Sequence, residues 1–190
     1  IFMLTKEAAK KLITATVIKT FGCTDPIAIA LAVSHAKELM EGSFQSMQIF
    51  LNPGLMKNAR SVGLPGTDER GIEFAAALAL VSSDPAKGLL LFEKITDENI
   101  EKAKKIKDSY NIEVLTDKSK ESLFIKVVLR SSESEITVII QDRHDQITLI
   151  EKNGKKLFEK ESLEKSSKEN IDLSQVNLKD LFEVMESFSE

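Results

Sequence analysis

The chain has 190 residues, of which 42% are hydrophobic and 29% charged, and its formal net charge is −4. These proportions are typical of a soluble globular protein of one or two domains, and the acidic balance, with no tryptophan and one tyrosine, argues against a nucleic-acid partner. No apolar run approaches the roughly 20 residues of a membrane-spanning helix, and a single cysteine suits a reducing compartment, so we expect a cytoplasmic protein without a membrane partner.

Residues 3–109 are predicted to be mainly helical. Apolar positions recur at helical spacing from Thr5, the expected N-cap, to about Lys19. An alanine-rich helix is predicted over residues 27–40, with Asp25 as its N-cap and Pro26 at its first position. The further elements expected are a strand over 44–51, a turn at 52–54 that opens a Gly- and Pro-rich loop, and helices over 71–81, 86–94 and 97–108.

Residues 110–161 are predicted to form an antiparallel β lobe, because the apolar period changes to two beyond Tyr110. The connections are too short for parallel crossovers, and Asn153-Gly154 is a strong hairpin signal. Residues 162–190 are expected to hold a charged linker and a helix over 178–188 that Asn177 caps. The expected strands cover residues 112–115, 123–129, 136–140, 147–150 and 156–159.

The expected fold class is therefore α+β, with an alanine-rich helical layer followed by an antiparallel sheet lobe and a C-terminal helix.

The single cysteine, Cys23, lies immediately before the second predicted helix, in the stretch FGCTDPIAIALAVSHA. A thiol just outside a helix N-terminus experiences the positive end of the helix dipole, which favours the thiolate that attacks or binds metal. The alternative is that Cys23 is a small buried apolar residue, as most free cysteines are. Its position leaves both interpretations open.

Three segments resemble, in order, a family that joins L-cysteine desulfidases with the alpha-chain region of iron–sulfur L-serine dehydratases. GCTDPIAIALAVSHA is similar to the family's GCTEPIA segment, with Asp25 in place of glutamate. Residues 57–89, beginning KNARSVGLPGTD, resemble its KN, VGIPGTG and AAALG pattern, and residues 143–161 resemble its HTNI segment and the hairpin that follows. The resemblance implies that Cys23 is one of three ligands of a [4Fe–4S] cluster. It also implies β-elimination of L-serine or L-cysteine to pyruvate and ammonia, with sulfide released from cysteine.

The same resemblance implies a site made of a catalytic histidine, His144, and substrate-binding residues Thr24, Lys57, Asn58, Gly66 and Thr67. Each has a plainer alternative. His144 could be an exposed turn histidine, the 57–58 pair could be solvated loop residues, and the glycine–threonine segment could be a turn before a helix whose first turn Asp68 and Glu69 already occupy. The other histidine, His35, is expected to be a core residue and is assigned no role.

One thiolate cannot hold a cluster that needs three or four, and the family's other two cluster cysteines belong to a C-terminal half without a counterpart here. We therefore expect the N-terminal portion of such an enzyme, either a truncated piece or one subunit of a split pair, which is cluster-free and inactive without its missing half or partner subunit. Cys23, Asn58 and Thr67 are expected to lie close together on one surface. The alternatives are a non-catalytic small-molecule-binding or regulatory module and a protein in which Cys23 acts alone as a nucleophile.

Overall fold

The computed structural model describes residues 5–82, 84–160 and 177–188. The chain divides into two compact units, a larger one of residues Thr20–Glu164 and a smaller one of Ile1–Lys19 with Lys165–Glu190. The expected division into a helical region of residues 3–109 and a β lobe of residues 110–161 differs from this one, because the larger unit contains both. The charged linker predicted before the C-terminal helix lies outside the described residues.

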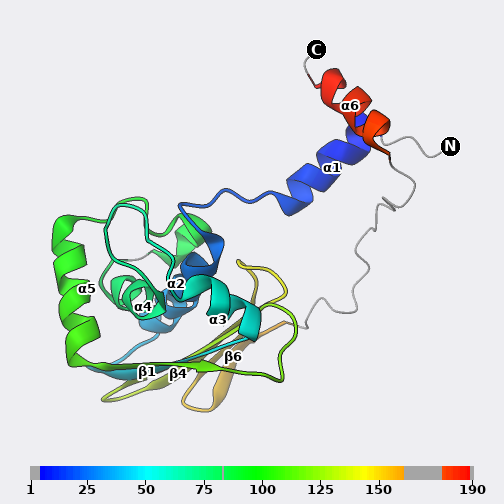
Figure 1. The fold of residues 1–190 in the computed structure, drawn as a ribbon. Coiled ribbons are helices and arrows are strands. Elements are labelled where there is room, and N and C mark those ends of the chain that lie inside the picture. The colour runs from blue at the N-terminus through cyan, green and yellow to red at the C-terminus, as the bar shows by residue number, and fades with distance from the viewer. Residues whose placement is uncertain (1–4, 83, 161–176, 189–190) are drawn as a thin grey trace. The chain divides into compact units, whose positions relative to one another are not determined.

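A six-stranded sheet in the order β2-β1-β3-β4-β5-β6 forms one layer of the larger unit (Figure 1). The tight turn between the last two strands has φ of 51° at Asn153 and 75° at Gly154, which matches the hairpin predicted from that dipeptide. Four strands pair antiparallel with their chain neighbours, as predicted: β3 (Phe124–Ser131), β4 (Glu135–Gln141), β5 (Ile147–Lys152) and β6 (Lys155–Glu159).

The sheet is mixed and not purely antiparallel. Strand β1 (Phe44–Leu51) pairs antiparallel with β3 on one side and parallel with β2 (Asn111–Thr116) on the other. The prediction of an antiparallel lobe confined to residues beyond Tyr110 was wrong at this edge. Three α-helices and one 3₁₀ helix lie between β1 and β2 along the chain, which is ample for a parallel crossover.

The helices of the larger unit lie on one side of the sheet (Figure 1). They are α2 (Thr24–Glu38), α3 (Pro53–Ala59), α4 (Ile72–Val81) and α5 (Asp97–Ser109). Helix α2 contacts β3, β4 and α4, and α4 in turn contacts α5. Alanines such as Ala28, Ala32 and Ala76 are completely buried, and their small side chains let the helices approach closely. The α+β class predicted from the sequence is confirmed.

Two predicted elements differ from the structure. Helix α3 replaces the start of the expected loop, because Pro53 at its first position is preorganised for a helix. The helix expected over 86–94 is a short 3₁₀ segment, Pro85–Leu90, interrupted by Gly88 with φ 53° and ψ −128°. Within the described ranges, every helix is too short or too polar to cross a membrane.

The smaller unit contains α1 (Lys6–Thr16) and α6 (Leu178–Ser187). Thr5 Oγ1 accepts a hydrogen bond from the backbone N–H of Ala8 at 3.1 Å, so Thr5 is the N-cap of α1 as predicted. Asn177 caps α6, also as predicted, through hydrogen bonds from the backbone N–H groups of Lys179 and Asp180. Lys6 Nζ donates to the carbonyl oxygen of Ser187, which joins the start of α1 to the end of α6.

Candidate functional site

A carboxylate and an imidazole, 119 residues apart in the chain, meet at the start of α2. Asp25 Oδ1 lies 2.8 Å from His144 Nε2. Their side chains are 13% and 31% exposed, so the pair is largely shielded but the imidazole is reachable from solvent. An ionised carboxylate can only accept, so with Asp25 ionised Nε2 donates and Nδ1 of a neutral imidazole remains an acceptor. A carboxylate in this position can orient a histidine, and such a pair is chemically capable of proton transfer.

The connection between β4 and β5 fixes His144 in a tight turn. Gln141 N donates to Gln146 O at 3.1 Å, and Gln146 N donates to Arg143 O at 3.1 Å. Asp142 has φ 69°, a left-handed conformation that aspartate tolerates better than most residues. These hydrogen bonds hold the backbone on both sides of His144 and leave its side chain to reach the buried Asp25.

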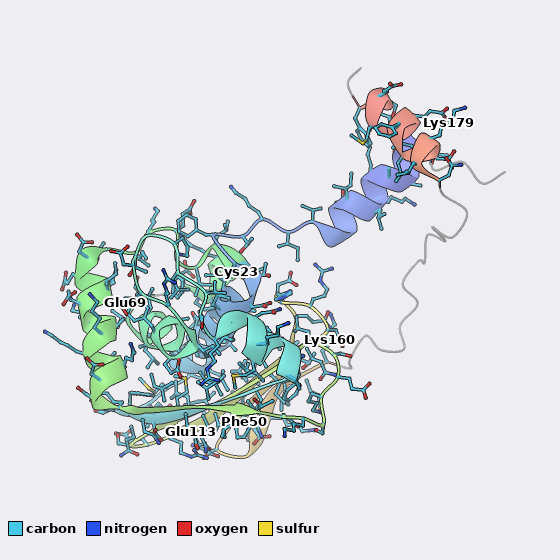
Figure 2. All side chains as sticks on the ribbon, viewed as in Figure 1. Cys23, Phe50, Glu69, Glu113, Lys160 and Lys179 are labelled. Atoms are coloured by element: carbon cyan, nitrogen blue, oxygen red, sulfur yellow. The ribbon has the colours of Figure 1, made fainter. Side chains whose placement is uncertain are left out.

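Cys23 is the N-cap residue of α2, with extended backbone angles of φ −66° and ψ 130°, and its side chain makes no capping hydrogen bond. Its thiol is free and the residue is exposed, so the interpretation of Cys23 as a buried apolar residue is wrong. Figure 2 shows Cys23 at the end of the helical layer remote from the labelled sheet residues Phe50 and Glu113. The predicted N-cap role of Asp25 is also wrong, because the helix begins at Thr24 and the Asp25 carboxylate contacts His144 instead.

The turn before Cys23 packs against the loop that contains the GLPGT segment. Gly22 has φ 99°, and a Cβ built on it would lie 2.9 Å from both Cγ and Cδ of Pro65. Only glycine therefore fits at this contact without a shift of the loop. The contact places Pro65, and with it the segment that leads to Gly66 and Thr67, beside the backbone that carries the thiol.

Thr67 takes part in a turn. Its Oγ1 accepts from the backbone N–H of Glu69 at 3.1 Å, and Leu64 N donates to Glu69 O at 3.2 Å. Helix α4 begins only at Ile72, with Gly71 as its N-cap, so Asp68 and Glu69 lie in the loop and not in the first helical turn that the sequence predicted. A plain turn therefore accounts for the hydrogen bond that the Thr67 hydroxyl makes. The preceding residue, Gly66, has φ 79° and is exposed.

The remaining predicted site residues lie on the helices. Thr24 is the half-buried first residue of α2, and Lys57 and Asn58 are exposed near the end of α3, a helix that contacts α2. The expected proximity of Asn58 to Cys23 and Thr67 stays a prediction. His35 is half-buried, and desolvation, opposed by the nearby Glu38 charge, lowers its pKa. Asp25 is the partner of His144 that sequence reasoning missed, because their separation of 119 residues in the chain hides their contact.

The donor set does not fit a complete iron–sulfur cluster. Across residues 5–82, 84–160 and 177–188, no three His, Cys, Asp or Glu side chains gather closely enough to hold a metal ion. The sequence has one cysteine, whereas a [4Fe–4S] cluster takes three or four thiolates. This chain can contribute one thiolate at most.

Fold and site together define an α+β protein in which one helix N-terminus carries an exposed thiol and a histidine–aspartate pair. The chain is 39% identical over 146 residues to a UPF0597 protein of Clostridium perfringens strain SM101, a match that covers 77% of this chain and 34% of that relative. It is 37% identical over 169 residues to a UPF0597 protein of Clostridium botulinum strain Hall, covering 87% of this chain and 39% of the relative. A UPF0597 protein of Clostridioides difficile strain 630 is 34% identical over 151 residues, which cover 80% and 35% of the two chains.

The chain thus spans between 34% and 39% of the length of these relatives. No family model matches the chain, and no solved structure matches it.

These matches correct the family resemblance drawn from the three motifs. The relatives are named UPF0597 proteins and not L-cysteine desulfidases or iron–sulfur L-serine dehydratases, so the assignment to that family was wrong. The motifs GCTDPIA and VGLPGTD are short, and they are rich in glycine, proline, threonine and aspartate, which turns and helix starts select on structural grounds alone. Such segments specify local backbone geometry more strongly than they specify an activity.

Proposed function

We propose that this chain supplies the acid–base centre of a larger enzyme that eliminates the β-substituent of L-serine or L-cysteine to give pyruvate and ammonia. The observation that carries the proposal is the 2.8 Å hydrogen bond between Asp25 and His144. Elimination needs a base that removes the α-proton, and a neutral imidazole whose other nitrogen is held by a carboxylate is suited to that step. Because the relatives are much longer, we propose the activity for a complete polypeptide and expect this chain to be inactive in isolation.

The steps assigned to the chain's own residues concern the proton. Nδ1 of His144 accepts the α-proton, and the electron pair of the broken C–H bond forms the Cα–Cβ double bond while the bond to the β-oxygen or β-sulfur breaks. Asp25 stabilises the imidazolium formed, and the imidazolium can return its proton to the leaving group as water or hydrogen sulfide. The resulting 2-aminoacrylate is hydrolysed to pyruvate and ammonia, so no oxidant or reductant is consumed.

Substrate binding is proposed for the residues around this pair. The Gly22–Pro65 contact supports a site in which Thr24, Gly66 and Thr67 border the substrate, with Lys57 and Asn58 of α3 near its carboxylate or amino group. Lys57 is the proposed partner of the carboxylate because it is an exposed residue whose side chain offers hydrogen-bond donors and no acceptor.

Cys23 has a separate proposed role. Its exposed, free thiol can supply one ligand of a [4Fe–4S] cluster whose other ligands lie outside this chain. When bound, such a cluster supplies Lewis-acid chemistry, and no step assigned above to His144 depends on it. A reduced thiol of this kind is consistent with a cytoplasmic enzyme, which we also propose.

The test is pyruvate formation from L-serine and from L-cysteine by the longest natural polypeptide that contains these 190 residues. We compare the wild type with His144→Gln, which keeps an N–H donor for Asp25 but lacks a base, and with His35→Gln as a matched control. His144→Gln should lower kcat about 10²–10⁴-fold, while His35→Gln should leave it unchanged. A His144→Gln enzyme with the wild-type kcat would contradict the proposal. So would a folded wild-type polypeptide that binds either amino acid without converting it, which would instead support a binding module.

A further inference from the structure

The last helix, α6, carries a large apolar face that is open to solvent. Its exposed apolar residues, together with Phe188 at its C-cap, recur at positions i, i+3, i+4, i+7 and i+10, which places them on one side of the helix. The exposed fractions are 74% for Leu178, 42% for Leu181, 63% for Phe182, 63% for Met185 and 42% for Phe188. A ten-residue helix is marginal in water by itself, so a face of this kind points to a partner surface.

Helix α1 covers little of that face. A hydrogen bond and a cation–π contact join the two helices at their ends, where Lys6 Nζ donates to Ser187 O and lies 5.5 Å from the centroid of the Phe188 ring. Ile13, near the other end of α1, is itself 50% exposed. The smaller unit therefore presents apolar side chains from both of its helices.

The charges of the two helices are complementary. Three lysines and one glutamate give α1 a net charge of +2, and one lysine against three carboxylates gives α6 a net charge of −2. A surface that carries both signs on neighbouring helices is complementary to a second copy of itself across a two-fold axis, which is the condition for an isologous interface. A membrane surface is disfavoured as the occupant because the polar side of α6 is acidic, whereas interfacial helices carry basic polar faces.

We propose that the α1/α6 unit is a homodimer interface in which the apolar face of α6 packs on the same unit of a second copy, with acidic α6 beside basic α1 of the partner. The interface lies in the smaller unit and does not depend on the function proposed for the larger one. Phe182 and Met185, the aromatic and thioether side chains at the centre of the face, are the expected anchors.

The first test is sedimentation equilibrium of the full chain over a wide range of concentrations. The wild type should dimerise, and Phe182→Asp should weaken dimerisation about tenfold or more. The matched control is Phe158→Asp on β6 of the larger unit, a phenylalanine that is 44% exposed and should have no effect. A monomeric wild type overturns the proposal, and is the result expected if another polypeptide or a lipid surface covers this face instead. A dimer that is disrupted by Phe158→Asp but not by Phe182→Asp also overturns it.

The second test separates pairing between copies from pairing within one chain. One variant, Lys10→Glu/Lys11→Glu, makes α1 acidic, and the other, Glu183→Lys/Glu186→Lys, makes α6 basic. Each should self-associate about tenfold more weakly than the wild type, because each presents like charges to its own copy. Mixed together they should form a heterodimer, since acidic α1 then meets basic α6 of the other chain. Absence of the heterodimer overturns the proposed arrangement.

Discussion

At the scale of single residues, Asp25 and His144 contribute to folding as well as to the proposed chemistry. Asp25 sits in the first turn of α2, where the positive end of the helix dipole stabilises a carboxylate. His144 supplies the hydrogen bond that compensates for the burial of that carboxylate. The pair therefore links the helical layer to the β4–β5 connection, and its loss should destabilise both.

His144→Ala should lower the free energy of unfolding by about 1–2 kcal/mol, because a mostly buried carboxylate loses its hydrogen-bond donor. His144→Gln, which can still donate to Asp25, should cost clearly less. Urea unfolding at neutral pH, followed by circular dichroism, measures both variants. Equal losses for the two would show that the hydrogen bond contributes nothing measurable and that only packing of the ring matters.

His35 should make stability depend on pH. Burial lowers its pKa in the folded chain below the ordinary 6.5, against a smaller opposing effect of the Glu38 charge. Unfolding therefore favours protonation, so stability is greatest above pH 6.5 and falls as the pH drops from there towards the folded-state pKa. Urea unfolding of the wild type and His35→Gln across this range measures the effect, and the variant should show the smaller decrease. An identical pH dependence in the two proteins would exclude His35 as its source.

At the scale of elements, the contact between Gly22 and Pro65 joins two loops that lie more than forty residues apart in the chain. The geometry leaves no room for a side chain at Gly22, whose φ of 99° is also unfavourable for any other residue. Gly63, in the second loop, has nothing within 4 Å of its would-be Cβ. The two glycines therefore form a matched pair for testing whether the contact matters.

Gly22→Ala should destabilise the chain by about 1–3 kcal/mol through backbone strain and the clash with the proline ring. Gly63→Ala should change stability by no more than about 0.5 kcal/mol. The double variant Gly22→Ala/Pro65→Ala removes Cγ and Cδ of the ring and should recover part of the loss, because only the backbone strain then remains. Urea unfolding of the three variants provides the comparison, and equal effects at Gly22 and Gly63 would rule out a special role for this contact.

Features that depend on residues close together in the chain could be predicted from the sequence. Features that depend on contacts between residues far apart in the chain could not. Thr5 and Asn177 cap α1 and α6 as predicted, because a capping side chain bonds to N–H groups two or three residues away. The parallel pairing of β1 with β2 joins segments separated by three α-helices and a 3₁₀ helix, and no turn residue encodes it. The same limit applies to the site. The position of Cys23 directly before a helix could be predicted, whereas its exposure and the Asp25–His144 contact depend on the packed fold.

At the scale of the whole molecule, α2 is the element that connects the core to the site. Its body packs against β3, β4 and α4, and its N-terminus carries both the free thiol and the carboxylate that holds His144. Rigid packing along the helix fixes the position of these groups, which favours preorganised chemistry over a flexible loop site. The chain nevertheless has only this one thiol, so by itself it cannot supply the three or four thiolates that a [4Fe–4S] cluster takes.

The isolated chain should therefore fail to hold a stable [4Fe–4S] cluster when it is given iron and sulfide under anaerobic conditions. One thiolate leaves most of the cluster's irons without a protein ligand, and carboxylates bind iron–sulfur centres poorly compared with thiolates. Iron and sulfide analysis after desalting, together with the visible absorbance of the sample, measures retention. Cys23→Ala is the control and should give the same low values as the wild type, because neither protein has a complete ligand set. A cluster that the wild type retains and Cys23→Ala loses would show that this chain completes the site by another route, such as one thiolate from each of several copies.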